Sequence, residues 1–249
     1  MLRAIVFLVG LAFVSALSSE FISNYTVACK RSSPDFNKCM KNALQNIIND
    51  LSKEDTPEED KLDPWVMPEI PLSFGTAAER MGITIGGETL TGLAHTQIKG
   101  FRSNLKNKNK LRVEIDIFNR RLNLEGNYTA VIMGPDSPSM SEGDFNVTIT
   151  GIRGTLVLKG HVVERDGQEY LSIDRAALKP QVTDLHIDVT NANDPFPELT
   201  GIVTSLVNQY WRLVYAEAVQ FIEEGLDGII RSYVQEAFND VPFDKIVPA

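Results

Sequence analysis

Cysteine is the residue type of this chain whose chemistry is easiest to assign from position alone. Cys29 and Cys39 are the only cysteines among 249 residues, and an apolar run over residues 4–17 precedes them. A basic residue before such a run and small residues after it are typical of a secretory signal peptide. In the oxidising compartment that follows secretion, a lone cysteine pair most simply forms one disulfide. We therefore expect residues 1–18 to be a signal peptide, residues 19–249 to form a single secreted domain, and Cys29 to be bonded to Cys39.

The histidines and carboxylates do not form the sets that catalysis requires. His95, His161 and His186 lie far apart in the sequence, and no serine stands in a Gly-x-Ser-x-Gly turn. His186 and Asp188 share one face of an expected strand and could hold a metal ion, but the apolar residues on the opposite face place both toward water. No glycine-rich phosphate loop is present either. We therefore expect no enzymatic activity, no cofactor and no metal ion.

Three Asn-x-Thr triplets mark candidate sites of N-glycosylation, at Asn24, Asn127 and Asn146. One such triplet is weak evidence, but three of them behind a signal peptide strengthen the secretory interpretation. We expect these asparagines to lie at the surface of an extracellular glycoprotein.

Charge is unevenly distributed along the chain. The net charge is −9 at pH 7, which repels phosphate groups and disfavours nucleic acid as a partner. Residues 99–112 nevertheless contain six basic and no acidic side chains, namely Lys99, Arg102, Lys106, Lys108, Lys110 and Arg112. One interpretation is a solvated hairpin tip. The other is a docking patch for an anionic membrane surface, an acidic partner or a receptor.

The periodicity of the apolar residues predicts the elements that must position these groups. Residues 36–51 carry apolar side chains at helical spacing, and residues 82–189 alternate apolar and polar side chains, which indicates long antiparallel strands with one apolar face. Helical spacing returns near the C-terminus and predicts one helix from about Gly201 to Asn239, roughly 58 Å long. We expect an α+β fold in which a curved sheet surrounds this helix.

Several short strings of residues occur over almost the whole mature chain in the order found in one family. They are Cys29-Lys30-Arg31-Ser32 with Asn37-Lys38-Cys39-Met40, Leu122-Asn123-Leu124-Glu125-Gly126-Asn127-Tyr128, Gly143-Asp144-Phe145-Asn146-Val147-Thr148-Ile149, and Val241-Pro242-Phe243-Asp244. In these strings the chain resembles the insect takeout and juvenile-hormone-binding family. The resemblance implies a long C-terminal α-helix wrapped by a strongly curved antiparallel β-sheet, with a short N-terminal helix tied by one disulfide. The lack of further cysteines favours the takeout branch.

Members of that family carry apolar ligands in an internal tunnel, so the resemblance implies a secreted carrier. Its ligand would be a juvenile-hormone-like isoprenoid, a fatty acid or a related lipid, and we expect the carrier to be a monomer. The alternative is a ligand-free recognition protein that acts through its basic hairpin. The residues expected to line the tunnel are apolar side chains of the first helix, the strands and the C-terminal helix, namely Met40, Leu44, Ile47, Ile115, Ile117, Leu122, Leu156, Leu158, Trp211, Val214, Phe221 and Ile222.

Overall fold

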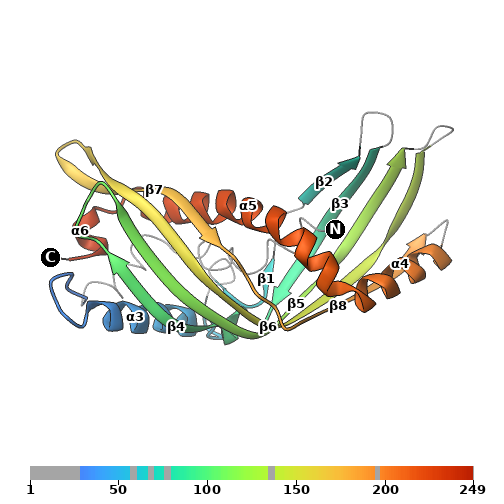
Figure 1. Ribbon diagram of the computed structural model, residues 1–249, viewed down its shortest axis with the longest axis horizontal. Coiled ribbons are helices and arrows are strands. Elements are labelled where there is room, and N and C mark those ends of the chain that lie inside the picture. Colours follow the sequence, from blue (N-terminus) through green and yellow to red (C-terminus); the bar gives the residue numbers. More distant parts are fainter. Residues whose placement is uncertain are drawn as a thin grey trace.

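The computed structural model describes residues 29–56, 61–66, 70–75, 80–133, 138–193 and 197–248. These residues form an α+β structure in which helices lie along an antiparallel sheet (Figure 1). The helices are α3 (Phe36–Leu51), α4 (Pro197–Gln209), α5 (Trp211–Phe238) and α6 (Phe243–Ile246), with a short 3-10 helix η3 (Leu93–His95). The strands are β1 (Trp65–Val66), β2 (Ile70–Gly75), β3 (Arg80–Thr91), β4 (Gln97–Asn104), β5 (Leu111–Met133), β6 (Pro138–Arg165), β7 (Gln168–Leu178) and β8 (Asp184–Asn193).

Two long strands, β5 and β6, pair with each other along almost their whole length and form the spine of the sheet. At one end of the spine, β4 pairs with β5 and β7 pairs with β6. At the other end, β3 pairs with β5 and β8 pairs with β6, while β1 and β2 add to β3. We call the first end the α3 half and the second the α4 half, after the helix that lies beside each (Figure 1).

Both spine strands change the side on which they bury their side chains where the two halves meet. In β5 the inward side chains occupy odd-numbered positions through Asn119 and even-numbered positions from Leu122 onward. In β6 the same change occurs between Ile149 and Ile152, at Gly151, whose φ is +63°. Because the register of the pair is the same on both sides of this point, the two strands turn together. The apolar faces of both halves thus contribute to one core.

Polar groups buried at this junction are paired. Asn119 is 2% exposed, and its side-chain nitrogen donates to the carbonyl oxygen of Gly92 at 2.8 Å and to the hydroxyl of Thr96 at 2.9 Å. Its side-chain oxygen accepts from the amide of Arg121 at 2.8 Å. The carboxylate of Asp63 accepts from the amide of Gly92 at 2.8 Å. These bonds stabilise the turn between β3 and β4 beside the point where β5 changes sides, because unpaired polar groups there would be costly.

Side-chain amides join helices to the free edges of the sheet. Gln45 on α3 donates to the carbonyl of Thr96 at 3.1 Å and accepts from the amide of Ile98 at 2.8 Å, at the start of β4. Asn208 on α4 both accepts from the amide and donates to the carbonyl of Ile187 on β8, each at 2.8 Å. Each carboxamide therefore supplies the donor and the acceptor that a neighbouring strand would supply, which protects edge groups from pairing elsewhere.

Helix α5 is joined to the edge of β7 in the same way. The side chain of Gln235 accepts from the amide of Ile173 at 2.7 Å and donates to the carbonyl of Leu171 at 3.1 Å. Further along the same edge, the carboxylate of Asp227 accepts from the amide of Ala176 at 2.6 Å. The C-terminal part of α5 therefore runs beside β7.

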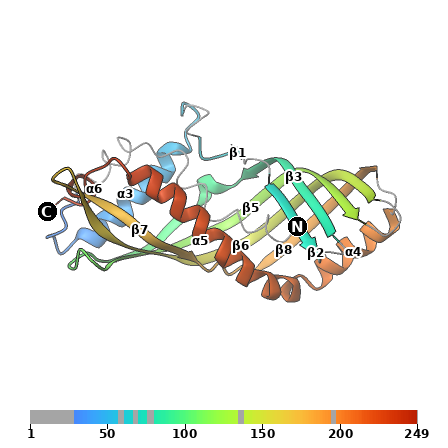
Figure 2. The ribbon, with the colours of Figure 1, turned by 90° about the horizontal axis from the view of Figure 1, so that it is seen from above.

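The expectation of one uninterrupted helix over 201–239, wrapped by the sheet, is wrong in two respects. Tyr210 has φ −112° and ψ 25°, and this departure from helical geometry separates α4 from the 28-residue α5. The two helices follow different edges, because Asn208 holds α4 to β8 whereas Gln235 holds α5 to β7. The sheet lies along α5 and does not wrap around it (Figure 2). Among the described residues, no helix is both long and apolar enough to cross a membrane.

Two aromatic residues hold the start of α5 in place after this break. Trp211 is 7% exposed and packs edge-on against Tyr215. The hydroxyl of Tyr215 donates to the carbonyl of Pro180 at 2.6 Å, in the connection between β7 and β8. Burial, with a smaller contribution from nearby Glu223, raises the pKa of Tyr215 to about 12. The phenol therefore stays neutral and remains a hydrogen-bond donor across the physiological range.

The N-terminal expectations are confirmed where the structure describes the chain. Cys29 and Cys39 form a disulfide that ties the segment before α3 to its first turn. The expected signal peptide, residues 1–18, and the glycosylation triplet at Asn24 lie outside the described residues. Of the other two triplet asparagines, Asn127 on β5 is exposed and Asn146 on β6 is half-buried.

Candidate ligand-binding cavity

A cavity of about 180 Å3 lies inside the α3 half, between the sheet and its helices. Strands β4 to β7 form one wall, α3 and the last turns of α5 form the sides, and α6 lies at one end. The cavity is partly open to solvent. Because Gln45 joins α3 to β4 and Gln235 joins α5 to β7, these two amides set how far the helices stand from the sheet edges.

Most of the residues expected to line a tunnel on α3 and on the spine strands do meet at this cavity. Their side chains come from three elements that are distant in sequence, and they are Met40, Leu44 and Ile47 of α3, Ile115 and Ile117 of β5, and Leu156 and Leu158 of β6. The alternation of β5 and the helical stripe of α3 were therefore sufficient signals, because each places its apolar residues on one side of its element.

Other expected residues lie elsewhere. Leu122 is buried in the core beyond the point where β5 changes sides. Trp211 is buried and Val214 is half-buried near the start of α5, away from the cavity, which touches only the last turns of that helix. The side chains of Phe221 and Ile222 lie outside the described residues. The expectation on α5 came from treating 201–239 as one helix, because the central part of such a helix would face the ligand.

Several lining residues were not expected to lie at the site. They belong to the first turn of α3, to β4 and the loop after it, to β5 and β7, to the end of α5 and to the C-terminal segment, and they are Phe36, Ile98, Phe101, Leu105, Leu111, Val113, Leu171, Ile173, Leu178, Val234, Ala237, Phe238, Phe243, Ile246 and Val247. Most already stood in the apolar patterns of their elements. The contribution of α6 had no such signal, because a helix of four residues shows no periodicity.

The C-terminal segment closes one end of the cavity together with the disulfide-linked N-terminal segment. Phe243 is 2% exposed and packs in the same cluster as Cys29 and Met40. The amide of Arg31 donates to the carbonyl of Pro248 at 2.7 Å, and its guanidinium lies over the ring of Phe243. Residues that are far apart in sequence thus cover the same end.

The interior of the cavity is hydrocarbon. Arg112 and Lys159 are the charged residues among those that line it, and both are exposed. The guanidinium of Arg112 bonds to Glu114 on the outer face of β5 at 2.6 Å, so its charge is directed away from the interior. A polar ligand group would find few partners here, and burying it unpaired would cost about 1–3 kcal/mol. The geometry therefore favours an apolar occupant and offers no set of groups for acid–base or nucleophilic chemistry.

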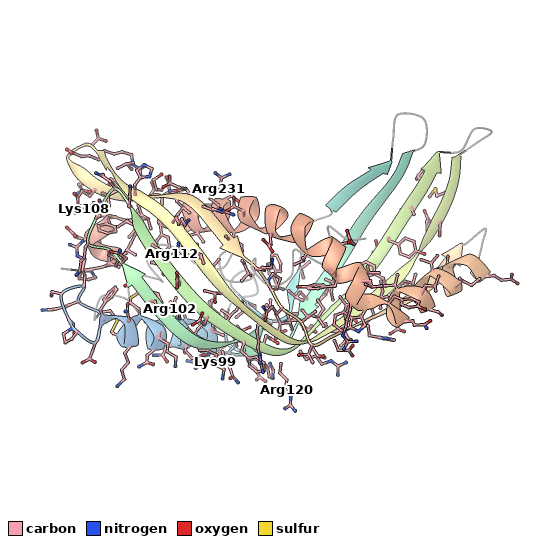
Figure 3. The ribbon with its side chains drawn as sticks, in the orientation of Figure 1. Lys99, Arg102, Lys108, Arg112, Arg120 and Arg231 are labelled. Carbon is pink, nitrogen blue, oxygen red and sulfur yellow. A yellow bond between two sulfur atoms is a disulfide. The ribbon has the colours of Figure 1, made fainter. Side chains whose placement is uncertain are left out.

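Three of the six cations of the basic segment 99–112, namely Arg102, Lys108 and Arg112, are paired with carboxylates. The guanidinium of Arg102 bonds to Glu114 and to Asp116, each at 2.9 Å, and Lys108 bonds to Glu169 at 2.6 Å. Figure 3 shows Lys99, Arg102, Lys108 and Arg112 spread along the outer side of the α3 half. Acidic residues of the neighbouring strands thus neutralise several of the cations, which argues against the alternative function through this hairpin.

These ion pairs also change the titration of the carboxylates. Hydrogen bonds from Arg102, with a further bond from Thr155, hold the pKa of Asp116 below its ordinary value. Hydrogen bonds from Arg102 and then Arg112 lower the pKa of Glu114. The ionised form of both carboxylates is favoured, because protonation would break these bonds.

The histidines occupy the outer surface. His186 lies 3.3 Å from Asp188 and both are exposed, as the alternation of β8 predicts. His161 lies 3.0 Å from Asp174 on the neighbouring strand. Within the described part of the chain, no three side chains of the metal-binding types gather into a site.

An antiparallel sheet that carries helices along its edges and encloses an apolar cavity defines the class of this protein as α+β. The family model of haemolymph juvenile hormone binding protein (JHBP) matches residues 6–248, and the chain belongs to this family. A direct sequence comparison with curated proteins finds no match.

Comparison with solved structures supports the fold. The crystal structure of Takeout 1 from Epiphyas postvittana is similar, with a TM-score of 0.62 and 20% identity over 86% of this chain and 96% of that one. At that identity the likeness concerns the fold alone. A lipopolysaccharide binding protein also aligns, at 12% identity over 90% of this chain and 39% of that one, but its TM-score of 0.38 is too low to support an argument.

Proposed function

We propose that this protein is a secreted carrier that binds a small hydrophobic ligand in the cavity of the α3 half. The observation that carries the proposal is the hydrocarbon interior, which is built by α3, the sheet and the end of α5. Membership of a family described as haemolymph juvenile hormone binding proteins supports the same function. The ligand class is an isoprenoid like juvenile hormone, a fatty acid or a related lipid. Binding requires no reaction, only transfer of the ligand from water.

The size of the cavity restricts the ligand further. An apolar protein cavity of ~150 Å3 stays dry and accepts a molecule of the size of benzene. The cavity here is slightly larger, at about 180 Å3. It therefore suits a slim chain or an isoprenoid unit better than a bulky ring system. A chain that buries about 300 Å2 of apolar surface gains about 7 kcal/mol, part of which offsets the entropy of association.

Secretion and glycosylation belong to the same proposal. The N-terminal apolar run and the haemolymph family support secretion. Asn127 and Asn146 lie at outward positions on β5 and β6, so that glycans there would point away from the core. The carrier is proposed to act as a monomer in extracellular fluid.

The test is ligand binding by the secreted, glycan-trimmed protein. Native mass spectrometry followed by organic extraction identifies any lipid that the protein carries, and a fluorescent fatty acid measures affinity. Ala237→Phe places a ring in the cavity, and we expect it to weaken binding at least tenfold. Ala216→Phe, on the exposed side of the same helix, is the matched control and leaves affinity unchanged.

Two results would overturn the proposal. One is wild-type protein that carries no lipid and binds neither the fatty acid probe nor an isoprenoid. The other is a folded Ala237→Phe variant that binds as tightly as the wild type, because the ligand would then occupy a different site.

A further inference from the structure

Helix α4 and the residues after it expose a set of large apolar side chains. Tyr210 is 49% exposed and Leu213 is 68% exposed, and three residues of α4 itself are similar: Ile202 at 57%, Val203 at 42% and Leu206 at 48%. Single exposed apolar residues are ordinary, but a contiguous group marks a surface that contacts an apolar partner.

The exposed apolar side chains of α4, with that of Tyr210, occupy one side of the helix. Ile202, Leu206 and Tyr210 are spaced four residues apart, so they follow one another along the same face. The opposite face is committed to the sheet, because Asn208 bonds to the edge of β8 and Val207 packs against the core. Figures 1 and 2 both place α4 at the periphery of the molecule, beside β8. The exposed stripe therefore faces away from the protein.

The charges on this face and on the whole chain indicate which kind of partner can contact the face. Residues 199–211 contain no Asp, Glu, Lys or Arg, and the exposed Arg212 directly follows them, in a chain of which 23% is charged and whose net charge is −9. A second copy would bring an equal net charge, and an anionic surface would also be repelled. A lipid surface without net charge is not repelled in either way. Tyrosine, as at Tyr210 on the end of the stripe, is a side chain favoured at the boundary between water and lipid.

We propose that the outer face of α4 docks on a lipid bilayer without net charge, such as one of phosphatidylcholine. The apolar side chains of the stripe enter the boundary between head groups and acyl chains, and the acidic remainder of the protein stays in water. This contact is a property of α4 and goes beyond the proposed ligand binding in the α3 half. If the protein carries an insoluble ligand, contact with the bilayer gives it a place to take up or release that ligand.

The experiment is flotation of the protein with phosphatidylcholine vesicles. We expect the wild type to float with the vesicles and the double variant Ile202→Gln/Leu206→Gln to float at least tenfold less. The matched control, Val66→Gln/Met140→Gln, removes side chains that are 67% and 52% exposed elsewhere, and it floats like the wild type. Because each of the four side chains is at least 48% exposed, melting temperatures should stay within a few degrees of the wild type, which verifies folding.

Several outcomes would overturn the inference. One is that the wild type fails to float at any lipid concentration, and another is that the double variant floats as well as the wild type. A third outcome is that sedimentation shows a dimer of the wild type and a monomer of the double variant, which would assign the face to a second copy. A fourth outcome is that replacing half of the lipid by phosphatidylserine strengthens binding, which would show that attraction to an anionic surface drives docking. The Ala237→Phe variant separates the two proposals, because we expect it to lose the ligand and to keep flotation.

Discussion

The two halves of the sheet share the strands β5 and β6, but they differ in what their helices do. In the α3 half, a helix is joined to each outer edge, by Gln45 at β4 and by Gln235 at β7, and the apolar faces of both helices turn inward around a cavity. In the α4 half, Asn208 joins α4 to the edge of β8, and α4 has apolar side chains on both sides.

The two halves show how one type of contact produces two kinds of apolar surface. A side-chain amide on an edge strand fixes where a helix lies but not how much of its apolar surface the sheet covers. Where two such helices face each other across a half-sheet, their apolar surface becomes interior and can hold a ligand. Where the helix lies at the periphery, part of its apolar surface stays outside and is available to another surface.

The largest expected effect comes from removing an edge amide. Gln235→Leu leaves the amide of Ile173 and the carbonyl of Leu171 without their partner, and the expected loss of stability is about 2–5 kcal/mol. Asn208→Leu does the same to Ile187 in the α4 half. Denaturant unfolding should show similar losses in both variants. Ligand affinity should fall only in Gln235→Leu, and an equal fall in both would contradict the separation of the halves.

The disulfide should have a smaller effect that is restricted to the α3 half. Replacing Cys29 and Cys39 by serine removes a constraint on a short loop, and the expected cost is about 2.8 kcal/mol on the chain-entropy view. Hydrogen exchange should accelerate in α3 and α6, which pack with Cys29, and should not change in β8. Acceleration of β8 to the same degree would show that the halves unfold as one unit.

The junction between the halves should be sensitive to an added side chain at Gly151. Its φ is +63°, a conformation that costs a residue with a Cβ about 1–2 kcal/mol of folding free energy. The added Cβ would also stand 2.1 Å from the hydroxyl oxygen of Thr183. Gly167→Ala is the matched control, because its φ is +76° and nothing lies within 4 Å of the added atom. We expect Gly151→Ala to lower the melting temperature more than Gly167→Ala. Equal shifts would mean that Thr183 moves aside at no cost.

The smallest expected effect concerns pH and the outer face of the α3 half. The pKa of Asp116 is lower in the folded state than its ordinary value. The ionised carboxylate therefore stabilises the fold above its ordinary pKa, and this stabilisation is lost as the pH falls through the folded-state pKa. Asp116→Asn should therefore be slightly less stable than the wild type at pH 6, and the difference should shrink towards pH 2. Asp184→Asn, an exposed carboxylate of the α4 half, is the comparison. Thermal melts across this range measure both, and a difference that grows on acidification would reverse the assigned sign.

Much of this architecture could be predicted from local patterns. The disulfide, the amphipathic α3 and the alternating β5 and β6 were expected because a periodic arrangement of apolar residues specifies an element and its buried face without knowledge of its neighbours. For the same reason Met40, Ile115 and Leu158 were expected to face the interior, and they lie at the cavity. The family resemblance was also recognisable from strings of residues, and the family assignment confirms it.

The remaining features depended on contacts that no local pattern encodes. The break at Tyr210 contains neither proline nor glycine, and it arises because α4 and α5 are held to different strands. Gln45, Asn208 and Gln235 are ordinary polar residues in sequence, and only the position of an edge strand gives them a partner. The ion pairs of Arg102 and Lys108 likewise depend on strands that pair from other parts of the chain.

By itself, then, the sequence determined the types of the elements, their apolar faces, the covalent link and the family, because these follow from spacing along the chain. The tertiary structure alone decided where the apolar faces meet. Whether they close around a cavity, as in the α3 half, or leave a stripe exposed, as on α4, depends on which strand edge each helix is bonded to. Those bonds join residues that are distant in sequence, and only the folded chain brings them within reach.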